Sequence, residues 1–174
     1  MLAKKAENKC SADRIGPYSF NEYVEIVKSF HGRPAPGVLI GGYMVQFAFI
    51  HCPEGELFDA ICETRCELPD AVQLLTPCTL GNTWLQVIDL GRFALTLYEK
   101  HQGEGARAYV EPAKLDLWPE IRSWYFNRNP GIQPDADLLM DQIRNAGSTI
   151  FGIQKVVVKP QLVHRGRRGR IAMC

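Results

Sequence analysis

An uncharged apolar run at residues 37–50 determines more about this fold than any other part of the sequence. The run contains one amide, Gln46, and it follows Pro36, which suits the first turn of a helix. A helix that is apolar on nearly every side belongs in a protein core. The run is too short to cross roughly 30 Å of hydrocarbon. Gly41 and Gly42 would each weaken an isolated helix by about 1 kcal/mol. We therefore expect a buried central helix with another backbone packed closely against these glycines.

The composition supports a globular protein without a strong electric field. Hydrophobic residues make up 46% of the 174 residues and charged residues 22%, which is ordinary for a soluble domain. The formal net charge is +1, so we expect neither nucleic acid nor a membrane as a partner. The polar N-terminus lacks the apolar segment of a secretory signal, which predicts a cytoplasmic location. In such a chain, cysteines are more often thiols or metal ligands than disulfides.

Helical patterns flank the central run on both sides. Ser19 and Glu22 form a capping box before an apolar stripe that extends to residue 30, where the Pro/Gly-rich segment 31–36 ends the helix. Shorter helices are predicted over 68–75 and 135–146, and residues 118–126 suit either a short helix or an aromatic wrap. Strand patterns occur at 57–61, 84–88, 93–98, 106–110 and 150–158, and the middle three are typical of an antiparallel meander.

The order of these elements, α-α-β-α-β-β-β followed by α-β, predicts an α+β protein with a mixed or antiparallel sheet covered by helices. We expect a lead-in over residues 1–18, a core domain over 19–160 and a basic extension over 161–174. The arginines of that extension could contact phosphates, but no aromatic residue lies among them, so a solvated tail is the simpler interpretation. Nucleotide-binding glycine loops, a nucleophile elbow and an HExxH zinc motif are absent from the sequence.

Candidate chemistry rests on one histidine and two cysteines at element boundaries. His31 lies in the stiff loop before the central helix, Cys66 follows the first strand, and Cys78 follows the third helix. Two thiolates and an imidazole suit zinc or another transition metal. The same groups suit a nucleophile, Cys78, beside a base, His31. They also suit a haem or other bulky cofactor, with Arg33 as a cation for its acidic group. All three hypotheses require the segments to converge, whereas Cys62, next to Ile61, is expected to be a buried apolar residue.

The motifs around these residues resemble the FmdE family of formylmethanofuran dehydrogenase proteins over about residues 19–110. The likeness rests on Phe30-His31-Gly32 followed by Pro36-Gly37, on Glu63-Thr64, on the stretch 70–82, and on Gly91 with the strand 95–98. The resemblance implies an α+β core that forms a homodimer and binds metal, commonly zinc, through His and Cys. It also implies an accessory role beside a molybdenum or tungsten enzyme or a related redox pathway, more firmly than it implies any reaction.

This sequence departs from the family pattern at three expected ligands. Arg33, Ala35 and Glu67 stand where the family usually has His, Cys and Cys, whereas His31 and Cys78 match. The resemblance, together with Cys66 one position away from Glu67, implies a metal site at His31, Cys66 and Cys78 with open positions. Residues 170–174 resemble the start of a C-terminal treble-clef zinc module, but the sequence stops at the first cysteine of that module. We therefore expect a module that is absent or cut short.

Overall fold

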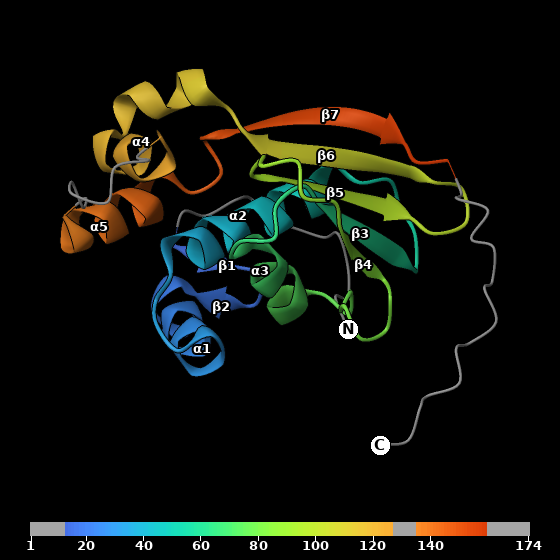
Figure 1. The fold of residues 1–174 in the computed structure, drawn as a ribbon, viewed down its shortest axis with the longest axis horizontal. Coiled ribbons are helices and arrows are strands. Elements are labelled where there is room, and N and C mark those ends of the chain that lie inside the picture. The colour runs from blue at the N-terminus through green and yellow to red at the C-terminus, as the bar shows by residue number, and fades with distance from the viewer. Residues whose placement is uncertain (1–12, 127–134, 160–174) are drawn as a thin grey trace.

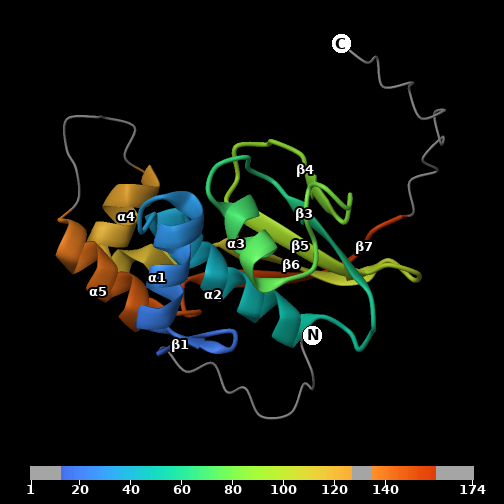
Figure 2. The same cartoon turned by 90° about the horizontal axis from the view of Figure 1, so that it is seen from below.

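The apolar run forms the helix α2 (Pro36–His51), which packs on one face of a five-stranded sheet (Figures 1 and 2). A computed structural model describes residues 13–126 and 135–159. Residues 37–45 and Ala48 of α2 are all buried. None of the helices in these described ranges is long and apolar enough to cross a membrane. The prediction of a buried central helix is confirmed.

The sheet is mixed, and its strand order is β4-β3-β5-β6-β7. Its strands are β3 (Phe58–Cys62), β4 (Leu85–Val87), β5 (Ala94–Glu99), β6 (Glu104–Val110) and β7 (Phe151–Val157). Strands β3, β5, β6 and β7 pair antiparallel in that order, whereas β4 pairs parallel to β3. With helices packed against the sheet, this arrangement confirms the α+β fold class.

The predicted antiparallel meander is wrong at its first step, because β4 pairs with β3 and not with β5. The connection after β4 crosses the end of β3, where Ile88 donates its backbone N–H to Cys62 and Leu90 donates to Glu63. These bonds place β4 at the sheet edge and leave β3 beside β5. The unit β3-α3-β4, with α3 (Leu68–Leu75) as its crossover helix, is therefore parallel.

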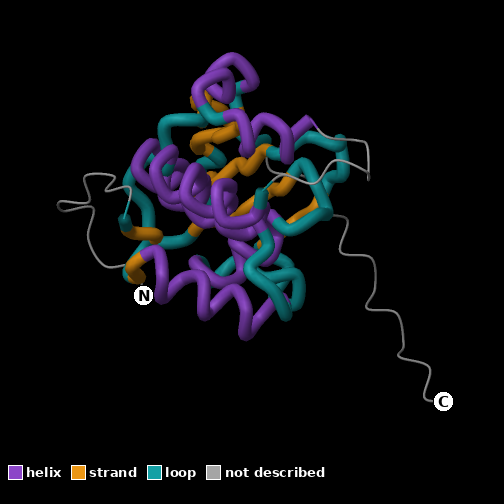
Figure 3. The backbone as a smooth tube through the Cα atoms, turned by 90° about the vertical axis from the view of Figure 1, so that its left-hand side faces the viewer, coloured by secondary structure: helices purple, strands orange, loops and turns teal. Residues whose placement is uncertain are grey.

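The remaining helices lie around α2 and at one end of the sheet, as Figure 3 shows in a second view. They are α1 (Phe20–His31), the 3-10 helix η1 (Pro112–Leu117), α4 (Pro119–Phe126) and α5 (Ala136–Ala146). The predicted capping box is present, since Ser19 N–H donates to the Glu22 carboxylate at 2.7 Å and Glu22 N–H donates to the Ser19 hydroxyl. Of the two alternatives for 118–126, a helix forms, and the turn η1 before it was not predicted.

Part of the expected lead-in lies in the core. The short strands β1 (Arg14–Ile15) and β2 (Tyr18–Ser19) form a hairpin, and Ile15 is fully buried. A Cβ at Gly42 would lie 2.8 Å from Ile15, so the hairpin packs directly on α2. A Cβ at Gly41 would lie 2.8 Å from the Ala71 Cβ of α3. The predicted close packing at both glycines is confirmed.

Three predicted features lie outside the described residues. They are the first twelve residues of the lead-in, the loop over 127–134, and the basic extension with the expected start of a zinc module at 170–174.

Candidate functional site

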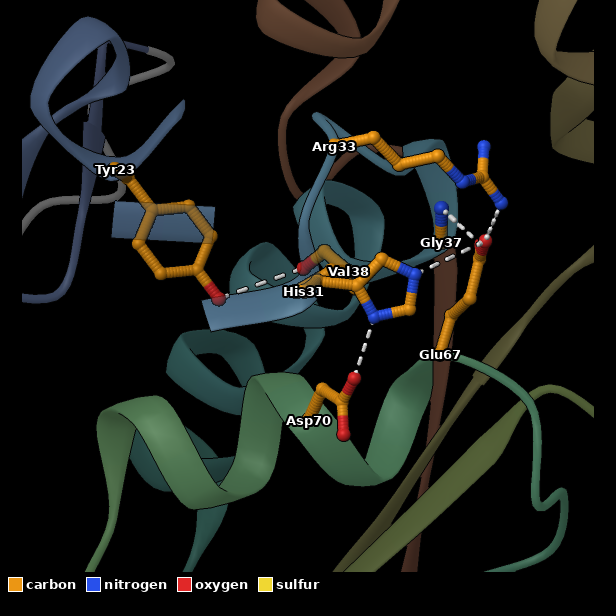
Figure 4. Close-up of polar contacts among 7 residues, drawn as sticks. All are labelled: Tyr23, His31, Arg33, Gly37, Val38, Glu67 and Asp70. Carbon is orange, nitrogen blue, oxygen red and sulfur yellow. Dashed lines mark hydrogen bonds and ion pairs between the residues drawn. The ribbon is translucent and has the colours of Figure 1, made fainter. Parts of the chain in front are cut away.

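Three segments meet at the N-terminal end of α3: the end of α1, the loop leading into α2, and the residues just before α3 (Figure 4). His31 is the last residue of α1, where Gly32 adopts a left-handed conformation that ends the helix. The His31 Nδ1 lies 2.6 Å from Oδ2 of Asp70, in the first turn of α3. A carboxylate only accepts hydrogen bonds, so Nδ1 carries the proton in this contact. The other ring nitrogen, Nε2, then has an available lone pair when the ring is neutral.

Glu67 is the second carboxylate of this junction, and both of its oxygens are engaged. Its Oε1 accepts from Arg33 Nη2 at 3.0 Å, and its Oε2 accepts from the Gly37 N–H at 2.9 Å. Gly37 lies in the first turn of α2, where backbone N–H groups have no partner within the helix. The His31 Nε2 is 4.0 Å from Glu67 Oε1. The imidazole therefore lies between two carboxylates, one on each ring nitrogen.

A strained turn directs Glu67 toward α2. Glu67 has φ 56° and ψ −42°, and the Leu68 N–H closes a three-residue turn by donating to the Cys66 carbonyl. Turns with a positive φ at a non-glycine residue are rare and unfavourable. Gly37 completes the arrangement, because a Cβ there would lie 2.3 Å from Glu67 Oε2. Sequence reasoning identified neither Glu67 nor Asp70 as a side-chain partner of this junction, although the acidic first turn of α3 was a signal for Asp70.

The two predicted cysteine ligands lie at opposite ends of α3. Cys66 is exposed and precedes the helix, at the same end as His31. Cys78 is buried beyond the other end, where its thiol donates to the Phe58 carbonyl at 3.2 Å. An eight-residue helix spans about 12 Å. The structure therefore brings His31 together with Asp70 and Glu67, and it does not bring His31 to Cys78.

The buried thiols are poorly suited to ionisation. Burial raises the pKa of the Cys62 thiol to about 12. Burial also raises the pKa of Cys78, although a hydrogen bond with Thr76 opposes the shift. Cys62 is fully buried, as the sequence predicted.

The side chains around His31 are too few for a closed metal site. Within residues 13–126 and 135–159, no group of three or more His, Cys, Asp or Glu side chains is arranged to hold an ion. A closed structural zinc needs four ligands, so such a site does not fit one chain. An open site with fewer protein ligands does fit the chemistry at His31, because metal-binding histidines commonly donate their second ring N–H to a carboxylate, as His31 does to Asp70.

A second polar cluster lies on the sheet and was not predicted. Arg107 of β6 donates from Nε and Nη2 to the two oxygens of Glu63 at 2.5 and 2.7 Å. The Arg107 Nη1 also donates to Gln154 at 3.1 Å, and its guanidinium lies 5.2 Å from the centre of the Tyr109 ring. This two-pronged bond lowers the pKa of the Glu63 carboxyl. Glu63 is part of the Glu63-Thr64 motif, but no sequence pattern joined it to Arg107.

The fold and this junction define a class: an α+β protein with a mixed sheet, helices packed against it, and a histidine–carboxylate pair between two helices. The chain belongs to the FmdE family, since the family model described as "FmdE, Molybdenum formylmethanofuran dehydrogenase operon" matches residues 30–158. The predicted family resemblance is confirmed.

Two individual relatives agree with this assignment to different extents. A crystal structure of an FmdE-like protein of tungsten formylmethanofuran dehydrogenase from Syntrophus aciditrophicus is 48% identical, with a TM-score of 0.81. The match covers 92% of this chain and 84% of that chain. A "Probable S-adenosyl-L-methionine-binding protein" of Archaeoglobus fulgidus is 38% identical over 149 residues, which cover 78% of this chain but only 41% of that protein. This chain therefore spans less than half the length of that relative.

Proposed function

We propose that this protein is a metal-binding accessory protein that holds one exchangeable transition-metal ion, in the first place zinc, at His31. The observation that carries the proposal is the 2.6 Å contact between His31 Nδ1 and Asp70. Because Asp70 accepts from Nδ1, it fixes the ring orientation and the tautomer in which Nε2 can bind a metal. Cys66, exposed at the same end of α3, is the proposed second ligand.

The small number of protein ligands supports an accessory role. Two ligands would leave a tetrahedral ion with two open positions, which a second copy of the chain, a partner protein or a small molecule can fill. A bound ion would supply positive charge and these open positions. The family description, which names a molybdenum enzyme operon, supports a role beside a molybdenum or tungsten enzyme. An ion with few ligands leaves its site readily, as transfer to a partner requires.

Two alternative hypotheses have less support. A nucleophilic role for Cys78 requires an accessible thiolate beside His31, whereas Cys78 is buried, has a raised pKa and lies past the far end of α3. A haem or another bulky cofactor at His31 and Arg33 requires a large hollow there. The hollow of about 520 Å³ in the described residues lies instead at the C-terminal end of α2, lined in part by His51, Cys52 and Lys155.

Metal titration of matched variants tests the proposal. Metal-free protein would be titrated with Zn²⁺ by calorimetry and with Co²⁺ by absorption, which reports thiolate ligands. We expect His31→Ala to abolish binding and His51→Ala, an exposed histidine at the end of α2, to leave it unchanged. Cys66→Ser should remove the Co²⁺–thiolate band. Zinc binding by His31→Ala at wild-type affinity would refute the proposal.

Two further outcomes of the same titrations assign the ligands and the partner. Cys78→Ser should keep the Co²⁺–thiolate band, whereas its loss would return Cys78 to the site in place of Cys66. Light scattering of the wild-type protein with and without zinc would show whether a second copy of the chain joins when the ion binds.

A further inference from the structure

We infer that the Arg33–Glu67 ion pair, which is seated on the first turn of α2, holds this junction together where the family resemblance implies a metal, so that the fold needs no resident ion. The inference starts from a disagreement between the expected ligands and the residues present. Positions 33 and 67 carry opposite charges here, and their side chains meet at 3.0 Å. The third departing position, Ala35, has no donor side chain and is fully buried.

The Glu67 carboxylate connects three separate segments. Through Oε1 it binds the loop before α2 at Arg33, and through Oε2 it binds the Gly37 N–H in the first turn of α2. Its own backbone lies directly before α3. One side chain thus makes the link between loop, α2 and α3 that a shared metal ion would make through ligands from the same segments.

The local backbone is shaped to deliver this carboxylate. Glu67 occupies a positive-φ turn that a non-glycine residue rarely adopts. A Cβ on Gly37 would collide with Oε2 at 2.3 Å and would approach Trp124 of α4 at 3.2 Å. The carboxylate fills the space above the first turn of α2, so both residues are fitted to one another.

The guanidinium supplies the positive charge that a metal would otherwise provide. The side chain of Glu67 is only 18% exposed, whereas that of Arg33 is 66% exposed. The contact with Gly37 therefore lies on the protected side of Glu67, and Arg33 covers the outer side. Glu67 Oε1 is already committed to Arg33, so it is not free to complete a metal site with His31 in this arrangement.

Thermal unfolding of the full chain, with and without a chelator, tests this inference independently of zinc affinity. We expect the Tm of the wild-type protein to be the same in EDTA as in untreated buffer. Glu67→Gln and Arg33→Met should each lower the Tm by about 3–6 °C, and the double variant should lower it by no more than the larger single effect. A fall in the wild-type Tm on chelation, or an unchanged Tm in Glu67→Gln, would overturn the inference.

An ordinary surface ion pair provides the matched control. Lys28 and Glu25 contact at 2.6 Å on one helix and connect no separate segments. Lys28→Met should therefore change the Tm by less than Arg33→Met. An equal effect of the two variants would show that the junction gains nothing from its ion pair.

A gain-of-function variant tests the equivalence directly. Arg33→His, Ala35→Cys and Glu67→Cys together would add three metal ligands around His31 and remove the ion pair. We expect the Tm of this triple variant to rise with zinc and fall with EDTA, unlike that of the wild-type protein. A triple variant that does not respond to zinc would overturn the equivalence. The proposed function fails separately, through the zinc titration of His31→Ala.

Discussion

Arg107 holds Glu63 across the central strand of the sheet, since β5 lies between the strand that carries Arg107 and the segment that follows β3. The Glu63 side chain is only 10% exposed, so removal of its charge leaves the guanidinium without its partner. Glu63→Gln should lower the free energy of unfolding at neutral pH by about 3 kcal/mol. Urea unfolding of the variant and the wild-type protein measures this difference.

The same pair predicts a specific dependence on pH. Because Arg107 lowers the pKa of Glu63 in the folded state, the pair stabilises the protein above the ordinary carboxyl pKa. That contribution is lost as the pH falls through the lowered pKa, so the difference between the wild-type protein and Glu63→Gln should shrink in acid. A difference that stays constant from neutral to acidic pH would contradict this explanation. Glu25→Gln, at an exposed pair, should show little effect at any pH.

Asp70 should control metal affinity through the orientation of His31. Asp70→Asn should weaken zinc binding about 10–100-fold, because carboxylates that hold a ligating histidine contribute affinity of this order. Asp137→Asn is the control, since Asp137 occupies the equivalent first turn of α5. Calorimetry would compare the two variants. If both weaken zinc binding equally, Asp70 does not act through His31.

Among the four cysteines in the described residues, Cys66 should be the one that reacts with an alkylating reagent in the native protein. Cys52, Cys62 and Cys78 are buried, and burial raises the pKa of the last two. Mass spectrometry of digested protein after brief treatment near neutral pH would locate the label. Rapid modification of Cys78 would instead favour its role as a nucleophile.

Gly41 should be required for the contact between α2 and α3. Gly41→Ala would place a Cβ 2.8 Å from the Ala71 Cβ, so the two helices must separate. We expect a net loss of about 1–3 kcal/mol in the free energy of unfolding, although alanine is the better helix former. Gly81→Ala, where the nearest atom would be 3.9 Å away, should have little effect. Equal stabilities of the two variants would contradict the packing.

Local patterns were sufficient for most helices but not for the strand pairing. The apolar run dictates α2 wherever its neighbours lie, and the capping box at Ser19 acts over three residues. The partner of β4 depends on bonds from Ile88 and Leu90 to the end of β3, which lies far earlier in the chain. No periodicity in residues 84–88 encodes that choice. The pairing of β4 was therefore not predictable from local patterns.

The candidate site was predictable only in part for a similar reason. His31 stands out in its stiff loop, but its partner Asp70 is 39 positions away. The separation of Cys66 from Cys78 could have been foreseen, because the predicted helix between them is long enough to keep their ends apart. The position of Glu67 could not, since it depends on an unusual positive-φ turn.

Anomalous diffraction from zinc-loaded crystals tests the central claim most directly, because it locates the ion without reference to activity. We expect a single zinc peak at Nε2 of His31, on the side of the ring opposite Asp70, with the Cys66 sulfur as its second ligand from this chain. A zinc peak at Cys78, or zinc-loaded protein with no peak at His31, would contradict the claim.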